Sequence, residues 1–151
     1  MKCHLILATA ILCSTPAFSM AGNLPFDKCF EAASTRFNVD KRMLVAIAKT
    51  ESSLNPNAVG PKNANGSYDI GMMQINTGWL PTLTKLGISR SDLLNGCNNI
   101  YVGAWIMAHN IHRHGSTWKA VGAYNASTAS KQVAYANRVL QNYELVGSLL
   151  N

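Results

Sequence analysis

The sequence predicts a mainly α-helical domain with one small β-hairpin, and three observations support this fold class. The 151 residues are 48% hydrophobic and 13% charged, a balance that suits one folded core and excludes disorder, collagen and coiled coil. Apolar residues recur at helical spacing through most of the chain. Asn65-Gly66, within a turn-rich stretch at 56–69, is a strong signal for a hairpin turn.

The predicted helices can be justified in chain order by their apolar spacing and their end signals. They cover residues 26–37, 41–52, 81–86, 97–114, 118–124 and 131–149. Asp40 is a good N-cap for the second helix, whose middle is apolar all round, so we expect that helix to be central and buried. Gly115 ends the long fourth helix. Ser89 and Asp92 resemble a capping box that would start a further helix.

The first 21 residues have the features of a secretory signal peptide. A positive start at Met1-Lys2 precedes an apolar stretch from about residue 5 to 18, and small residues follow at Ser19 and Ala21. The apolar stretch is too short to span a membrane, and no later stretch is apolar enough to do so. We therefore predict a signal peptide over 1–21 and one domain over 22–151, located in the periplasm without stable membrane insertion. The alternative is a buried N-terminal helix.

Export determines how the cysteines are interpreted. Two of the four cysteines leave with the signal peptide, so Cys29 and Cys97 remain, and an even pair in an oxidising compartment predicts one disulfide. It would close a loop of about 67 residues, worth roughly 4 kcal/mol in the loop-entropy model. The alternative is a pair of buried free thiols.

The charge balance indicates an acidic partner. Loss of Lys2 leaves twelve basic and seven acidic side chains, a net charge of about +5, which suits the acidic cell wall. The basic residues are scattered, without the run of Lys and Arg that a nucleic-acid groove needs, so we expect no nucleic-acid partner. We expect a monomer.

Glu51 is the best candidate for acid catalysis. It follows Leu44 by seven residues and Ile47 by four, so it lies on one face of the helix expected to be buried. It also falls in that helix's last turn, where the macrodipole disfavours negative charge. The buried helix face and the negative end of the helix dipole both favour the protonated carboxyl, which a general acid needs at neutral pH. The alternative is that Glu51 points to solvent at a frayed end.

Three segments around Glu51 carry a family resemblance. They are ESSLNPNAV at 51–59, GMMQIN at 71–76 and AYNA at 123–126. In this order and spacing the chain resembles the soluble lytic transglycosylase family, which is goose-lysozyme-like, and within it the small exported members that accompany secretion systems, conjugation and pili. The resemblance covers nearly the whole chain from about Cys29 to Tyr143.

The resemblance implies a lysozyme-like α domain that cleaves the β-1,4 bond between N-acetylmuramic acid and N-acetylglucosamine in peptidoglycan. It implies that Glu51 protonates the glycosidic oxygen and then takes the proton of the muramic acid 6-hydroxyl, so that a 1,6-anhydro ring closes. The family positions beside the glutamate and along the sugar cleft match Ser52, Gly71, Met73, Gln74, Tyr124 and Asn125.

Asp69 is a second candidate catalytic carboxylate. The stretch from Asn65 to Asn76 also resembles the hairpin of animal-type lysozymes, where an aspartate before a glycine is the second catalytic carboxylate. A hairpin folded over the end of the Glu51 helix would bring two carboxyls near one bond, and hydrolysis then becomes possible beside transglycosylation. The alternative is a turn aspartate that binds its own backbone.

The remaining candidates are an aromatic residue and a histidine cluster. Trp79 follows the segment expected to edge the cleft, so it is the best of the three tryptophans for stacking on sugar, with core packing as the alternative. The spacing of His109, His112 and His114 suits a solvated helix end better than a metal site. We predict no metal and no cofactor.

The sequence therefore predicts a peptidoglycan lytic transglycosylase that locally opens the cell wall for a secretion, conjugation or pilus machine, of which it could be a component. Two alternatives stay open: a hydrolytic muramidase, and a non-catalytic cell-wall-binding adaptor.

Overall fold

The first two helices form where the apolar spacing places them. In the computed structural model, which describes residues 24–150, α1 spans Asp27–Phe37 and α2 spans Lys41–Ser52. The Asp40 side chain accepts a hydrogen bond of 2.8 Å from the backbone N–H of Arg42, which confirms it as the N-cap of α2. Residues 44–48 of α2 are all buried, so this helix is central as expected. The predicted signal peptide lies outside the described residues.

The β-hairpin exists, but its turn does not lie at Asn65-Gly66. Strand β1 (Asp69–Ile70) pairs antiparallel with β2 (Ile75–Asn76), and residues 71–74 make the turn between them. Asn65-Gly66 instead lies at the tip of the preceding loop, where the Gly66 N–H donates to the Asn63 carbonyl. The two sides of this loop do meet, through an antiparallel bridge between Val59 and Ile70 and a hydrogen bond from the Gly60 N–H to the Asp69 carbonyl. Asn65-Gly66 therefore reverses the chain, but the turn of the β1–β2 pair lies at 71–74, where a buried contact holds it.

That contact is made by Asn99, which lies on the long helix that follows the hairpin and is fully buried. Its amide accepts from the N–H of Met73 at 2.7 Å and donates to the carbonyl of Ile70 at 2.8 Å, so it satisfies both ends of the turn. Gly71, at φ +77°, lies so close to the Asn99 amide that a Cβ there would overlap it. These contacts hold the turn of the β1–β2 hairpin at 71–74.

The remaining predicted helices lie within a few residues of their predicted bounds, and one further helical turn, at 77–79, was not predicted. These elements are η1 (Thr77–Trp79), α3 (Leu80–Lys85), η2 (Asp92–Leu94), α4 (Gly96–His114), α5 (Trp118–Gly122) and α6 (Ala129–Leu150). The capping box forms, with the Ser89 N–H donating to Asp92 Oδ2 and the Asp92 N–H to Ser89 Oγ. It starts only the single turn η2, because Asn95 then caps a new helix, α4. Gly115 ends α4, at φ +75°.

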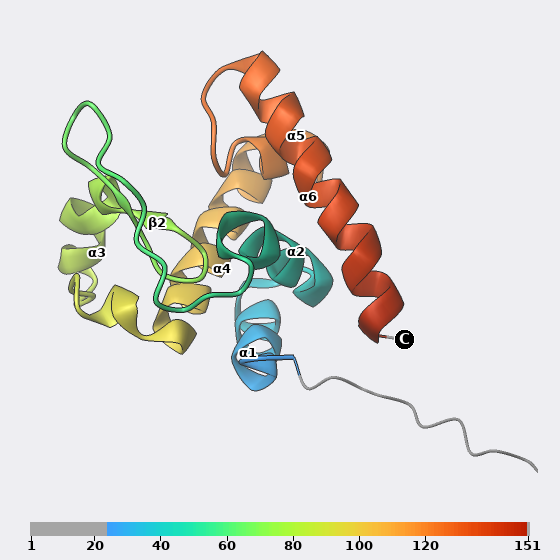
Figure 1. Cartoon of the computed structure of the whole chain (residues 1–151), viewed down its shortest axis with the longest axis horizontal. Coiled ribbons are helices and arrows are strands. Elements are labelled where there is room, and N and C mark those ends of the chain that lie inside the picture. The colour runs from blue at the N-terminus through green and yellow to red at the C-terminus, as the bar shows by residue number, and fades with distance from the viewer. Residues whose placement is uncertain (1–23, 151) are drawn as a thin grey trace, which may run out of the picture.

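The helices enclose α2 and leave its C-terminal end facing the hairpin. Helix α6 packs along α2 and α5, whereas α4 packs on α1, α5 and η2. In Figure 1, α6 runs along one side of the molecule, and the hairpin and α3 lie on the opposite side, with α2 between them. The last turn of α2 therefore lies where the two sides meet.

A disulfide joins the first turns of α1 and α4. Cys29 and Cys97 are bonded, with their Cα atoms 5.3 Å apart and 68 positions apart in the sequence. This confirms the predicted pairing. The bridge ties α1 to the helix that carries Asn99, and so to the base of the hairpin.

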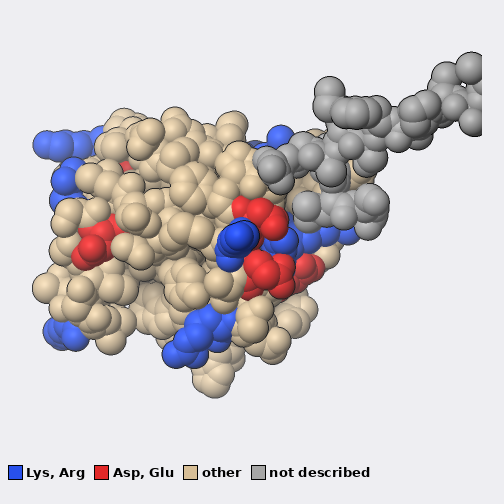
Figure 2. Space-filling model, turned by 90° about the horizontal axis from the view of Figure 1, so that it is seen from below, with Lys and Arg blue, Asp and Glu red and all other residues tan. Residues whose placement is uncertain are grey.

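The surface shows no concentration of basic charge on the face seen in Figure 2. Lys and Arg side chains are spread over it, and most of the acidic atoms gather in one region. One ion-paired group is formed by Lys41, whose ammonium lies 2.8 Å from Asp27 and 3.2 Å from Glu31. Within residues 24–150, no helix is long and apolar enough to cross a membrane.

Candidate active site

Glu51 lies in the last turn of α2, partly buried at the edge of a pocket. Its Oε1 accepts a hydrogen bond of 2.6 Å from the hydroxyl of Tyr135 on α6. The pKa of Glu51 is raised from 4.5 to about 7. Burial is the main cause and the negative charge of Asp69 adds to the rise, while the Tyr135 hydrogen bond and the Arg138 charge act in the opposite direction. A carboxyl with a pKa near neutrality can both give and take a proton at physiological pH.

Two stacked tyrosines lie beside this carboxyl. The rings of Tyr124 and Tyr135 are nearly parallel, with centroids 6.4 Å apart. Burial, together with the charge of Glu51, raises the pKa of both phenols above the ordinary value, so both stay neutral and act as donors. Tyr124 donates to the carbonyl of Met73 at 3.0 Å, which links the loop after α5 to the turn of the hairpin.

Tyr135 was not among the predicted site residues, although the sequence contains a signal for it. Tyr135 precedes Val139 by four residues on the predicted last helix, so both belong to one apolar face. A tyrosine on a buried face needs a polar partner for its hydroxyl. Here Tyr135 is 1% exposed and its partner is Glu51.

Asp69 lies across the same pocket, on β1. Its Oδ1 accepts a hydrogen bond of 2.8 Å from the side-chain amide of Asn76, the residue paired with it on β2. The Asn76 Oδ1 in turn accepts from the N–H of Gly78, which fixes the orientation of the amide. The Asp69 carboxylate is therefore held by the hairpin at a defined position in the pocket wall.

The pocket between Glu51 and the hairpin has a volume of about 350 Å³ and a mainly polar lining. Its lining residues are Glu51, Asn63, Asp69, Gln74, Ile75, Asn76, Trp79, Ile106, Tyr124 and Asn125. The structure thus brings together six of the nine residues for which the sequence suggested a catalytic or sugar-binding role. Trp79 packs its edge against Trp105 with centroids 5.5 Å apart.

The other three residues lie behind the pocket wall. Gly71 and Met73 are buried residues of the hairpin turn itself. Ser52 donates from Oγ to the Met72 carbonyl at 2.7 Å, which joins the end of α2 to that turn. Gln74, at φ 47°, turns its amide inward and donates to the carbonyl of Gly71 at 2.8 Å. Together these contacts hold the hairpin against the helix that carries Glu51.

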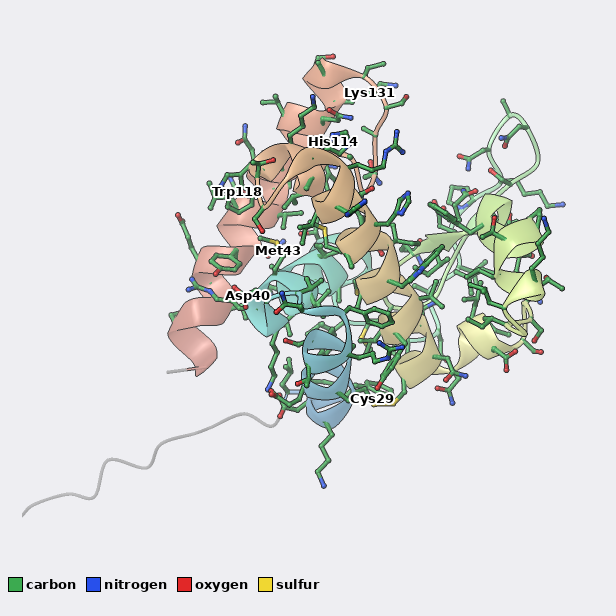
Figure 3. All side chains as sticks on the ribbon, turned by 180° about the vertical axis from the view of Figure 1, so that it is seen from behind. Cys29, Asp40, Met43, His114, Trp118 and Lys131 are labelled. Atoms are coloured by element: carbon green, nitrogen blue, oxygen red, sulfur yellow. A yellow bond between two sulfur atoms is a disulfide. The ribbon has the colours of Figure 1, made fainter. Side chains whose placement is uncertain are left out.

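The histidine cluster lies away from this pocket. The His109 ring stacks on the Trp105 ring with their centroids 6.3 Å apart. His114 lies at the end of α4 (Figure 3). Within the described part of the chain, no three His, Cys, Asp or Glu side chains form a group that could hold a metal ion. The pocket itself presents carboxyl, side-chain amide and phenol groups.

Comparison with known proteins gives one consistent result. Residues 28–145 match the family model of the transglycosylase SLT domain. The chain is 40% identical to invasion protein IagB of Salmonella typhimurium, over 80% of this chain and 78% of that protein. It is 34% identical to protein IpgF of Shigella flexneri, over 88% and 86% of the two chains.

A solved structure shows the same fold. An inactive mutant of lytic transglycosylase Slt from Pseudomonas aeruginosa superposes with a TM-score of 0.67 at 21% identity. The match covers 89% of this chain but 25% of that larger one, so this chain corresponds to one part of it.

Proposed function

Since this chain belongs to the transglycosylase SLT family and is a peptidoglycan lytic transglycosylase, we propose that the pocket at the end of α2 is its active site and that Glu51 is its acid and base. The observation that carries this proposal is the partly buried carboxyl with a pKa of about 7, hydrogen-bonded to Tyr135 and facing a polar pocket. The substrate bond is the β-1,4 link between N-acetylmuramic acid and N-acetylglucosamine.

The reaction needs two proton transfers at one carboxyl. Protonated Glu51 gives its proton to the glycosidic oxygen as the bond from that oxygen to C1 of the muramic acid breaks. The Glu51 carboxylate then takes the proton of the 6-hydroxyl, whose oxygen bonds to C1 and closes the 1,6-anhydro ring. Glu51 ends protonated, and no water is consumed. A pKa close to the working pH suits a group that acts first as acid and then as base.

Tyr135 and Asp69 have opposite effects on the pKa of the Glu51 carboxyl. The Tyr135 hydroxyl stabilises the carboxylate form, whereas the Asp69 charge disfavours it. Asp69 also presents negative charge to a sugar that becomes positive at C1 in the transition state, beside the help of the substrate's own N-acetyl group. Asn76 keeps the Asp69 carboxylate in place for this role.

The wall of the pocket has separate binding and positioning parts. We assign sugar contact to Gln74, Trp79, Tyr124 and Asn125, which line the pocket. We assign a positioning role to Ser52, Gly71 and Met73, because their contacts hold the hairpin on α2. An error of about 1 Å in this placement is enough to lower a rate roughly a hundredfold.

A second candidate function is hydrolysis by the same pocket. Asp69 is the observation that favours it, since a second carboxylate in the pocket could support a water-consuming route. The two functions differ in their product. A transglycosylase leaves 1,6-anhydro ends, and a muramidase leaves reducing ends.

The test is product analysis by mass spectrometry on purified sacculi. Wild-type protein should release anhydro-muropeptides, and the Glu51→Gln variant should release none. Reducing-end products that depend on Glu51 would mean that the pocket hydrolyses the bond instead of forming the anhydro ring. Asp69→Asn would then be the next variant to test. Products from Glu51→Gln at the wild-type rate would remove Glu51 from the proposal, and binding without any product would favour the adaptor.

We further propose that the protein is exported to the periplasm and opens the wall locally for a secretion, conjugation or pilus machine. The apolar segment at 5–18 and the name "invasion protein" given to one relative support this. A fusion of residues 1–30 to a reporter that is active only outside the cytoplasm tests export. Loss of reporter activity when the apolar segment is interrupted by charged residues is the expected result.

A further inference from the structure

The loop between α5 and α6 brings two residues to the active-site pocket. Tyr124 and Asn125 both line the pocket, and the loop continues to Thr128 before α6 begins at Ala129. The Tyr124 hydroxyl is fixed by its bond to the Met73 carbonyl. Asn125 is exposed, and its side chain makes no hydrogen bond within residues 24–150. The place of the Asn125 amide in the pocket wall therefore depends on the backbone of the loop.

Gln132 holds this backbone from the beginning of α6. Its Nε2 donates a hydrogen bond of 2.9 Å to the carbonyl of Ala126, the residue that follows Asn125 in the chain. The backbone N–H groups of Asn125 and Ala126 reach the Gly122 carbonyl at 3.4 and 3.2 Å, which are long distances for such bonds. The Gln132 amide therefore makes the shortest of these contacts with the segment that carries Asn125.

Gln132 can act as a fixed point because its own backbone packs against α5. A Cβ at Gly122 would lie 2.7 Å from both the Cβ and the carbonyl oxygen of Gln132, closer than a Cβ comes to such atoms in proteins. Only glycine at this position lets α5 and α6 come so close. Tyr135 follows Gln132 by one turn on α6 and donates to Glu51. This part of α6 therefore carries one residue that holds the catalytic carboxyl and one that holds the neighbouring loop.

We propose that Gln132 is a positioning residue of the active site, which holds Asn125 at the pocket through its hydrogen bond to the Ala126 carbonyl. The inference rests on the proposed function, in which Asn125 contacts the sugar. Gln132 donates to the protein and not to the substrate, so its effect on sugar binding should pass through Asn125. Its replacement should leave the acid and base chemistry in place, because Tyr135 keeps its bond to Glu51.

The test is a double-mutant cycle on sugar binding, measured by calorimetry in the Glu51→Gln background so that turnover does not interfere. The probe is soluble glycan strands of alternating N-acetylglucosamine and N-acetylmuramic acid, freed of their peptides. Gln132→Leu removes the donor at similar volume and should weaken binding about fivefold, as expected for loss of one neutral hydrogen bond. Asn125→Ala should weaken binding at least as much. In the Asn125→Ala protein, Gln132→Leu should change the affinity by less than about twofold.

Kinetics of the protein with Glu51 intact separate positioning from a loss of structure. Gln132→Leu should raise KM about fivefold, with kcat within about twofold and the alkaline limb of the pH profile unmoved. A general loosening of the fold would instead lower kcat and act equally in both arms of the cycle. Gln141→Leu, the same substitution at an exposed position of α6, is the matched control and should change neither constant.

A conservative variant tests whether the hydrogen bond itself carries the effect. Gln132→Glu keeps the shape of the side chain, but its carboxylate cannot donate to the Ala126 carbonyl at neutral pH, so binding should be weakened at least as much as in Gln132→Leu. Below about pH 4 the protonated acid can donate again. The affinity, relative to that of the protein with Gln132 at the same pH, should then recover.

Three results would overturn the inference: equal losses with and without the Asn125 side chain, no loss in either case, or no recovery of Gln132→Glu at low pH. Absence of turnover by the wild type would count against the proposed function alone. The binding cycle would still decide the role of Gln132, because it does not depend on turnover.

Discussion

The burial of Glu51 predicts that its replacement by glutamine stabilises the protein, and that the gain depends on pH. The carboxyl has a pKa of about 7 in the folded protein and an ordinary value of 4.5 when unfolded. Below pH 4.5 both states are protonated, so burial of the neutral acid and of the amide should cost about the same. Between pH 4.5 and about 7 the unfolded state loses the proton while the folded state keeps it, so the wild type loses stability relative to the variant across this window. Above about pH 7 both states are ionised and the difference stays constant.

The magnitude follows from the two pKa values. The difference between 4.5 and about 7, at about 1.36 kcal/mol per pH unit, amounts to roughly 3 kcal/mol. The gain of Glu51→Gln in the free energy of unfolding should therefore be below about 1 kcal/mol at pH 5 and about 3 kcal/mol at pH 8. In a domain of this size, the larger value corresponds to a rise in melting temperature on the order of 10 °C.

The assay is urea unfolding of both proteins at pH values from 5 to 8, with equal m-values as the condition for comparison. Glu144→Gln is the matched control, because Glu144 is exposed on α6 and its replacement should have little effect at any pH. A gain that is the same at pH 5 and pH 8, or a variant less stable at pH 8, would refute the reasoning. Either result would mean that Tyr135 and Arg138 compensate the buried charge in full.

Three further predictions concern rates and the disulfide. The kcat/KM of the wild type on peptidoglycan should fall about tenfold per pH unit above a pH of about 7, because the acid form of Glu51 starts the reaction; a flat profile to pH 9 would contradict this. Tyr135→Phe removes the hydrogen bond that lowers the pKa of Glu51, so this alkaline limb should move to higher pH, and a shift to lower pH would exclude the assigned role. Cys29→Ser should lower the free energy of unfolding by roughly 4 kcal/mol with the pocket intact, whereas equal melting temperatures under oxidising and reducing conditions would argue against a contribution of the Cys29–Cys97 bond.

The features that the sequence determined by itself are those set by neighbours in the chain. Helix α2 could be placed because Asp40 caps it and its apolar residues follow one another, and these local signals also placed Glu51 in the partly buried last turn. The disulfide followed from counting the cysteines that remain after export. The resemblance of three short segments then led to the family that the comparisons established.

Only the tertiary structure decided how distant parts of the chain meet. The hairpin turn at 71–74 is held by Asn99 on α4, which accepts from the backbone N–H of Met73, 26 positions earlier in the chain. The partner of Glu51 is a tyrosine 84 positions later, brought there by the packing of α6 on α2. Contacts of this kind depend on how helices pack rather than on local spacing, so a single sequence does not reveal them.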